Sequence, residues 1–127
     1  MSDFNSQHNR VVWVDIPVSD LERAGDFYAA VLGLQVHQQT FGDVRFAVLD
    51  HQDGNGGCLV LKPAEVSTSG ILVYMNTDGR LRDAVSKAKE HGGQIIEPIH
   101  SIGPHGFRAF VRDSEGNRIA LHSNTDA

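Results

Sequence analysis

Apolar residues along the chain recur with two periods, and these predict short strands and amphipathic helices. Residues 11–16 alternate as in a half-buried strand, whereas residues 19–32 carry apolar side chains at helical spacing. Ser19 and Glu22 have the spacing of a capping box, so the helix is expected to begin at Ser19 and to end at Gly33. Three more strands are expected in this half, over 34–37, 44–49 and 58–62.

The second half of the chain repeats this order. It begins with an expected strand over 70–76 and a helix over 80–91, which ends at Gly92-Gly93. The remaining segments are a short strand, a loop and two strands, over 94–97, 98–106, 107–112 and 118–122. Each half is therefore predicted to be one β-α-β-β-β module, over 11–62 and 70–123, within a single domain of 127 residues.

Two matching segments give the clearest sign of this duplication. Residues 53–62 align with residues 113–122 without a gap, at a constant offset of 60. Each segment opens with a turn that has Asp first and Gly fourth, in which Asp bonds the backbone and Gly permits a positive φ. Each turn then leads into a short strand with two aliphatic residues on one face.

A module of this kind covers one face of its sheet with its helix and leaves the other face bare. Two curved mixed sheets set side by side then enclose a cleft, so the expected fold class is α+β, with two βαβββ modules around a cleft. Alternation along the strands assigns a mixture of side chains to that cleft, namely Trp13, Asp15, Cys58, Val60, Lys62, Leu72, Tyr74, Arg118, Ala120 and His122. Ligand pockets have this composition, with apolar walls and a few polar groups.

Composition narrows the classes of function. Hydrophobic residues make up 40% of the chain and charged residues 21%, as in ordinary globular proteins. The net charge is −5 and the basic residues are scattered, so no nucleic-acid partner is expected, and cationic ligands are weakly favoured. No apolar run is long enough for a membrane span, and residues 1–10 form a polar arm without the apolar segment of a signal peptide. We therefore expect a cytoplasmic protein, in which the single Cys58 rules out an internal disulfide.

Several motifs make the chain similar to one superfamily. They are Asp15-Ile16-Pro17-Val18-Ser19-Asp20-Leu21-Glu22-Arg23-Ala24, then Phe27-Tyr28, Leu32-Gly33-Leu34 and Gly92-Gly93, and the terminal segment from Asp113 to Ser123. Together they resemble the vicinal oxygen chelate superfamily, which includes glyoxalase I, extradiol dioxygenases and bleomycin-resistance proteins. The likeness is strongest to its uncharacterised glyoxalase-related members. The resemblance implies a homodimer, with clefts at or near the interface between the subunits.

The resemblance also implies where a metal would sit, because the superfamily binds metals through four positions that usually hold His or Glu. In this chain they fall on Trp13, about Val60, about Gly70 and Ala120, and none of these supplies a side-chain ligand for a divalent ion. We therefore expect no metal and no cofactor. The expected function is that of a cleft that binds a small aromatic or cationic molecule, as in bleomycin-resistance proteins.

An enzyme of the lyase or isomerase type is the alternative hypothesis. Asp15 and His122 both fall on the predicted cleft face, and if their strands adjoin, Asp15 can orient the imidazole of His122 as a general base. The structural alternative is a hydrogen bond that closes the end of a strand. A non-standard metal site is also considered, formed by Asp15 and His122 with either His100 or His105.

Aromatic residues of the cleft have a binding role and a structural alternative. Trp13 and Tyr74 form a stacking platform for a planar ligand, which Phe107 or Phe110 extends. Alternatively, the same rings fill the space between the two halves as core.

Three further cleft residues carry reactive or charged groups. Cys58 is a nucleophile if a base lowers its pKa, or else a small buried hydrophobe. Lys62 and Arg118 bind a carboxylate or phosphate, or else they end their strands in solvent. The remaining candidates, Val60, Leu72 and Ala120, are expected to form the apolar wall.

Overall fold

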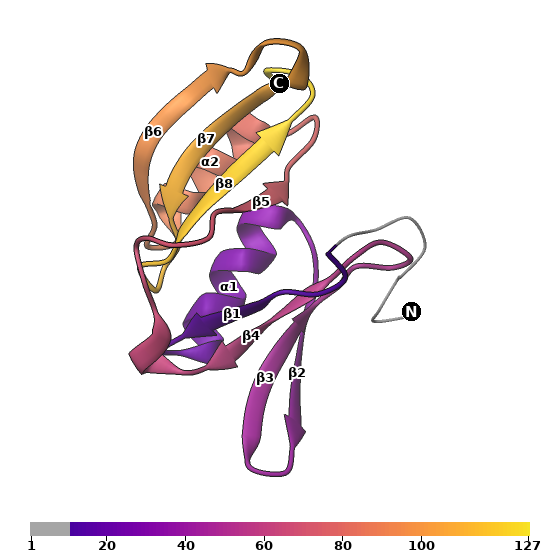
Figure 1. Cartoon of the computed structure of the whole chain (residues 1–127), viewed down its shortest axis with the longest axis vertical. Coiled ribbons are helices and arrows are strands. Elements are labelled where there is room, and N and C mark those ends of the chain that lie inside the picture. The colour runs from indigo at the N-terminus through magenta and orange to yellow at the C-terminus, as the bar shows by residue number, and fades with distance from the viewer. Residues whose placement is uncertain (1–10) are drawn as a thin grey trace.

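The computed structural model describes residues 11–127 as two four-stranded mixed sheets, each covered by one helix (Figure 1). The first module contains β1 (Asp15–Val18), α1 (Leu21–Leu32), β2 (Val36–Phe41), β3 (Val44–Leu49) and β4 (Gly57–Leu61). The second contains β5 (Val73–Asn76), α2 (Leu81–Glu90), β6 (Gln94–Ser101), β7 (Phe107–Arg112) and β8 (Arg118–Ser123). Two short 3-10 helices are η1 (Pro63–Glu65) and η2 (Gly103–His105). The predicted α+β fold with two βαβββ modules is confirmed, and the arm expected over residues 1–10 lies outside the described residues.

Both sheets have the same topology. The strand order is β1-β4-β3-β2 in the first sheet and β5-β8-β7-β6 in the second. In each sheet the first strand of the module runs parallel to the last, and the other neighbours are antiparallel. Pro17 lies in β1, which is an edge strand and therefore tolerates a residue without a backbone N–H.

The two helices lie on the same side of the sheets. In Figure 1, α1 passes behind β1 and β4 and α2 lies behind β7 and β8, so the helix-free faces of both sheets are turned toward the viewer. The helices pack against each other, and one core joins them to the helix-side residues of both sheets. Its largest fully buried apolar side chains are Tyr28, Phe27, Leu59, Leu81 and Leu121. Neither helix of the described chain is long and apolar enough to cross a membrane.

The ends of α1 depend on two different signals. Gly33 ends the helix as predicted, in the left-handed conformation with φ 65° and ψ 42°. The predicted capping box of Ser19 and Glu22 is wrong, because the N-cap is Asp20, whose side chain accepts a hydrogen bond from the backbone N–H of Arg23 at 3.0 Å.

In the second module, β6 is longer than predicted. It extends to Ser101 instead of ending at residue 97, and it passes through Pro98. Its pairing with β7 shifts register twice along this stretch. Because β6 is an edge strand, a proline and the irregular register can be accommodated there.

The turn between β7 and β8 is closed by its own side chains, as predicted. One carboxylate oxygen of Asp113 accepts hydrogen bonds from the backbone N–H groups of residues 115, 116 and 117 at 2.8–2.9 Å, and Gly116 has a φ of 106°. The other oxygen accepts a bond of 2.6 Å from the hydroxyl of Tyr28, which lies in α1. Burial, together with the charge of Asp113, raises the pKa of Tyr28 well above its ordinary value.

Glu115 of the same turn makes a second connection between the modules. Its side chain is 0% exposed, forms an ion pair with Arg23 at 2.7 Å, and accepts hydrogen bonds of 2.9 Å from the backbone N–H groups of Ser19 and Asp20. Burial raises the pKa of this carboxyl, but hydrogen bonds from Arg23, Ser114 and the two backbone groups outweigh burial and lower the pKa from 4.5 to about 2. The second module therefore supplies the anion that satisfies the first N–H groups at the start of α1.

Candidate functional site

An open pocket of about 540 Å³ lies on the helix-free face of the second sheet. Its lining residues are Tyr74, Met75, Asn76, Ile102, His105, Arg108 and His122. In the sheet, His122 of β8 lies between Asn76 of β5 and Arg108 of β7, so three adjacent strands contribute to the floor. Tyr74 is 46% exposed and lines this pocket, so an aromatic side chain is available there.

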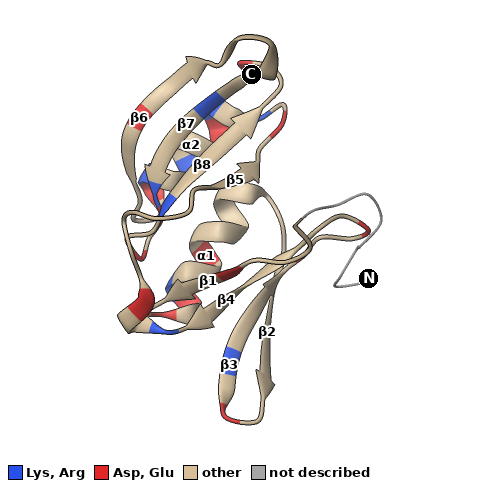
Figure 2. Cartoon of the chain, in the orientation of Figure 1, with Lys and Arg blue, Asp and Glu red and all other residues tan. Residues whose placement is uncertain are grey.

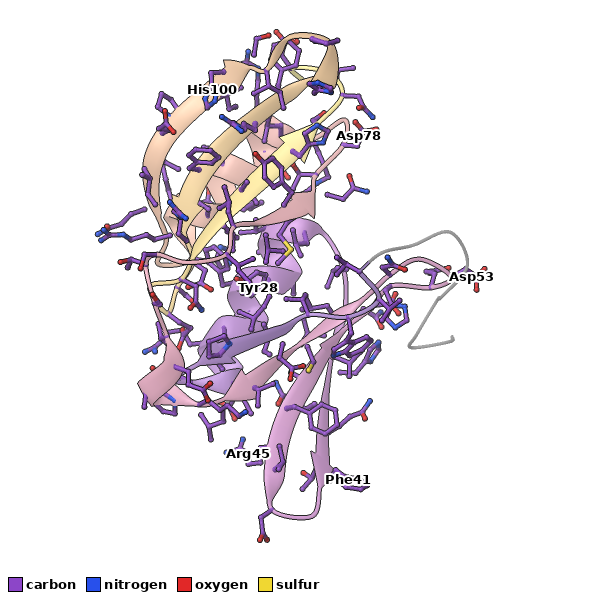
Figure 3. The ribbon with its side chains drawn as sticks, in the orientation of Figure 1. Tyr28, Phe41, Arg45, Asp53, Asp78 and His100 are labelled. Carbon is purple, nitrogen blue, oxygen red and sulfur yellow. The ribbon has the colours of Figure 1, made fainter. Side chains whose placement is uncertain are left out.

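Arg108 is the only Arg, Lys, Asp or Glu side chain among the lining residues. Its Nε donates a hydrogen bond to Nε2 of His100 at 3.0 Å, and its Nη1 donates to the hydroxyl of Tyr74 at 2.5 Å. The guanidinium carbon lies 4.5 Å from the ring centroid of Phe110, a cation–π contact. Figure 3 shows His100 on β6, so the side chain of Arg108 is contacted from the strands on either side of the pocket.

His122 has one ring nitrogen in use and one without a partner. Its Nε2 lies 2.7 Å from the backbone carbonyl oxygen of His105. Because a carbonyl oxygen only accepts, Nε2 carries the hydrogen of this bond. In the neutral ring Nδ1 is then an acceptor, and no residue of 11–127 bonds to it. The ring also lies 6.4 Å from that of Tyr74, at a tilt of 58°.

The helix-free face of the first sheet is mostly apolar. Val48, Cys58 and Val60 form a small buried cluster, and Trp13 and Phe46 pack against it. The carboxylate of Asp15 accepts hydrogen bonds from the indole N–H of Trp13 and from the thiol of Cys58, both at 3.2 Å. A thiol that donates to a carboxylate is protonated, so the geometry favours the structural alternative for Cys58.

Four further candidates from the sequence lie in the second sheet, on two faces. Arg118 and Ala120 are on the helix-free face, where Arg118 donates a hydrogen bond of 3.1 Å to the carbonyl oxygen of Gly70. Phe110 pairs with Ala120 and shares that face. Phe107 lies on the opposite face of the sheet and packs against the main core. Of the two phenylalanines, only Phe110 therefore lies on the face that carries the pocket.

Two other candidates lie outside the strands. Lys62 follows β4 and is exposed, with its ammonium 3.7 Å from the carboxylate of Glu65. Leu72 precedes β5 and is half-buried. Neither residue lines the pocket of the second sheet.

The structure does not bring Asp15 and His122 together. Asp15 lies in the first sheet and bonds Trp13 and Cys58, whereas His122 lies in the second sheet and bonds the backbone of His105. Within residues 11–127, no three His, Cys, Asp or Glu side chains are close enough to hold a metal ion. The non-standard metal site considered from the sequence is therefore not formed by the described chain.

Sequence reasoning missed part of the pocket. Arg108, Asn76 and Ile102 were not candidates, whereas His105, which the sequence offered only as a metal ligand, lines the pocket from the connection between β6 and β7. The charges of the second sheet include basic positions on β7 and β8 and an acidic one on β6 (Figure 2). The register between β7 and β8 would have indicated Arg108, because it pairs with the candidate His122.

Comparison with known proteins agrees with this architecture. A family model described as the glyoxalase/bleomycin resistance protein/dioxygenase superfamily matches residues 10–121. A glyoxylase-like domain-containing protein of Didymella fabae is 28% identical over 121 residues, which cover 90% of this chain and 93% of that protein.

Two solved structures illustrate the shared fold. A glyoxalase/bleomycin resistance protein/dioxygenase family enzyme from Burkholderia phytofirmans PsJN has a TM-score of 0.70 and 20% identity, over 88% of this chain and 96% of that one. A fosfomycin resistance protein from Listeria monocytogenes has a TM-score of 0.68 and 10% identity, over 91% and 93% of the two chains. At these identities the likeness concerns the fold alone.

Proposed function

The chain belongs to the glyoxalase/bleomycin resistance protein/dioxygenase superfamily, and on this premise we propose that it binds a small aromatic molecule without a metal ion. The binding site is the pocket beside Tyr74 on the second sheet. The four positions to which the resemblance assigns metal ligands fall on Trp13, about Val60, about Gly70 and on Ala120, and none of these residues supplies a side-chain ligand. Ring stacking and shape then replace metal chemistry as the source of affinity.

The exposure of Tyr74 in the pocket is the observation that carries this proposal. It stands in an open pocket next to the imidazole of His122, with Met75 and Ile102 as apolar neighbours. Aromatic rings that meet at favourable angles contribute about 0.5–1.5 kcal/mol beyond their buried area. The charge of Arg108, the only one among the lining residues, opposes the cationic ligand that the overall acidic composition suggested. The proposal is therefore restricted to aromatic ligands.

A thermal-shift panel of small aromatic compounds tests the proposal. We expect members of the panel to raise the melting temperature of the wild-type protein, and Tyr74→Ala to abolish the effect. Ile71→Ala is the matched control, because Ile71 is a 92% exposed apolar residue that does not line the pocket. No stabilisation by any compound, or the same response in Tyr74→Ala, would contradict binding at this pocket. A stoichiometric metal in untagged protein would contradict the metal-free part.

Acid–base catalysis at His122 is the second candidate function, of the lyase or isomerase type. The acceptor nitrogen Nδ1 of His122, which bonds to no described residue, favours it. Asp15 has its own partners in the first sheet, so His122 would act without it. Turnover of a pocket ligand that His122→Asn abolishes, with binding retained, would support catalysis, whereas unchanged ligand after long incubation would leave binding alone.

We also propose that the protein forms a homodimer. Phe41 and Val44 are exposed apolar residues of the β2–β3 hairpin, next to the apolar helix-free face of the first sheet. Contact with a second copy would remove this surface from water. Light scattering after size-exclusion chromatography should give twice the chain mass of 13.9 kDa, and Phe41→Asp should shift the mass toward the monomer. A wild-type monomer at all concentrations would contradict the dimer.

A further inference from the structure

Arg108 is held in one orientation by residues of three strands. The hydroxyl of Tyr74 on β5 and the imidazole of His100 on β6 accept its hydrogen bonds, and the ring of Phe110 on β7 lies under its guanidinium. A guanidinium restrained in this way loses little further freedom when it binds a ligand. The arrangement therefore resembles a prepared binding group more than a solvated surface arginine.

His100 is itself fixed by its neighbours. Its Nδ1 lies 2.9 Å from the carbonyl oxygen of Pro98, so Nδ1 carries the hydrogen. Its Nε2 therefore carries a lone pair and accepts the hydrogen bond of 3.0 Å from the Nε–H of Arg108. The imidazole is thus neutral in this geometry, and it positions Arg108 without neutralising its charge.

The positive charge of Arg108 has no carboxylate partner in the described chain. None of the ion pairs formed within residues 11–127 involves Arg108. The carboxylate on the same face of β6, Glu97, is opposite Phe110 in the sheet and forms no ion pair with Arg108. Two of the five N–H donors of the guanidinium are used by Tyr74 and His100, and three stay available. A half-buried charge without a counter-ion favours an anionic ligand.

We propose that Arg108 binds the carboxylate of an aromatic acid in this pocket, an inference that rests on the proposed binding function. The ring of the ligand lies against Tyr74, and its carboxylate meets the free edge of the guanidinium. A monoanion fits better than a doubly charged phosphate, because the lining residues contain one formal positive charge and no acidic side chain.

Three probes of one shape test this inference: 2-naphthoate, the neutral 2-naphthamide and the cationic 2-naphthylmethylamine. We expect the wild-type protein to bind the carboxylate about 10- to 100-fold more tightly than the amide, as charge-assisted hydrogen bonds produce, and the amine more weakly still. Titration calorimetry of the wild-type protein measures this order directly and needs no variant. Higher salt should weaken binding of the carboxylate but not of the amide.

Arg108→Gln should reduce the preference for carboxylate over amide to about onefold while amide binding changes little. Arg108→Lys, which keeps the charge but loses the planar fork, should give an intermediate preference and serves if Arg108→Gln folds poorly. Arg112→Gln is the matched control, because Arg112 lies on the same strand and face but outside the pocket, and it should keep the wild-type preference.

Two results would separate this inference from the proposed function. If the amide binds as tightly as the carboxylate, or if Arg108→Gln and Arg108→Lys both keep the wild-type preference, the role of Arg108 is refuted while aromatic binding stands. If none of the three probes binds, both the proposed aromatic binding at this pocket and the proposed role of Arg108 are refuted.

Discussion

Replacing Glu115 by Gln should destabilise the protein in a way that depends on pH. The carboxyl of Glu115 has a pKa lowered from 4.5 to about 2 by hydrogen bonds from Arg23, Ser114 and the backbone at the start of α1. At about 1.4 kcal/mol for each pH unit, this shift corresponds to roughly 3 kcal/mol. Because the side chain of Arg23 is 53% exposed, solvent screens part of the ion pair, and we expect a loss of about 2–3 kcal/mol at pH 7.

The direction of the pH dependence follows from the lowered pKa. Above about pH 4.5 the carboxylate is charged in both the folded and unfolded states, so its full contribution is present. Between pH 4.5 and about 2 the unfolded state binds the proton first, so the contribution declines as the pH falls. The difference in unfolding free energy between wild type and Glu115→Gln should thus fall to less than half by pH 3.

Urea unfolding followed by circular dichroism measures this difference at several pH values. For a chain of this size the midpoint should fall by about 1–2 M urea at pH 7, with the slope unchanged. Asp26→Asn is the matched control, since it removes the same charge from an exposed site in α1, and it should change stability by less than about 0.5 kcal/mol. A difference that stays constant from pH 7 to pH 3 would refute the role assigned to the Glu115 carboxylate.

Two other contacts lead to further predictions. Tyr28→Phe leaves a buried oxygen of Asp113 without one of its donors and should cost about 1–3 kcal/mol in urea unfolding; an unchanged midpoint would contradict this. Because the pKa of Tyr28 is raised well above its ordinary value, alkaline titration of the native protein should show less phenolate absorbance than its two tyrosines allow, until unfolding releases the remainder. Gly93→Ala should cost about 1–3 kcal/mol, since the added Cβ would lie 2.6 Å from the backbone oxygen of Arg112 and 2.8 Å from that of Ala88. Gly54→Ala, whose Cβ would meet only a backbone oxygen at 3.4 Å, is its control, and equal midpoints for the two variants would refute the steric argument.

Local signals in the sequence predicted most of the architecture. Gly33 marked the end of α1, and the turn from Asp113 to Asn117 marked the start of β8, because both depend on backbone conformations that only a few residue types adopt. The capping box failed because the backbone N–H groups of Ser19 and Asp20 bond a carboxylate far along the chain. A hydrogen-bond partner so distant in the sequence cannot be predicted from the residues around the start of the helix.

The candidate site was less accessible to sequence reasoning, for two physical reasons. Alternation gives the face of a residue but not its distance from other strands, so Asp15 and His122 shared a predicted face without being neighbours. The register between β7 and β8, by contrast, could be predicted from the sequence. The turn at Asp113–Asn117 pairs residues whose numbers add up to 230, which places Arg108 beside His122 and Phe110 beside Ala120.

The bonds that Glu115 and Tyr28 make across the modules have a consequence for the covalent continuity of the chain. They join the turn at 113–117 to α1, and the shared core joins the helices, whereas the connecting residues 63–69 are largely exposed. No residue of this connection is buried, so a nick there would leave the shared core intact. The protein should therefore keep its shape after such a cut, and its halves, once separated, carry complementary surfaces through which they can reassemble.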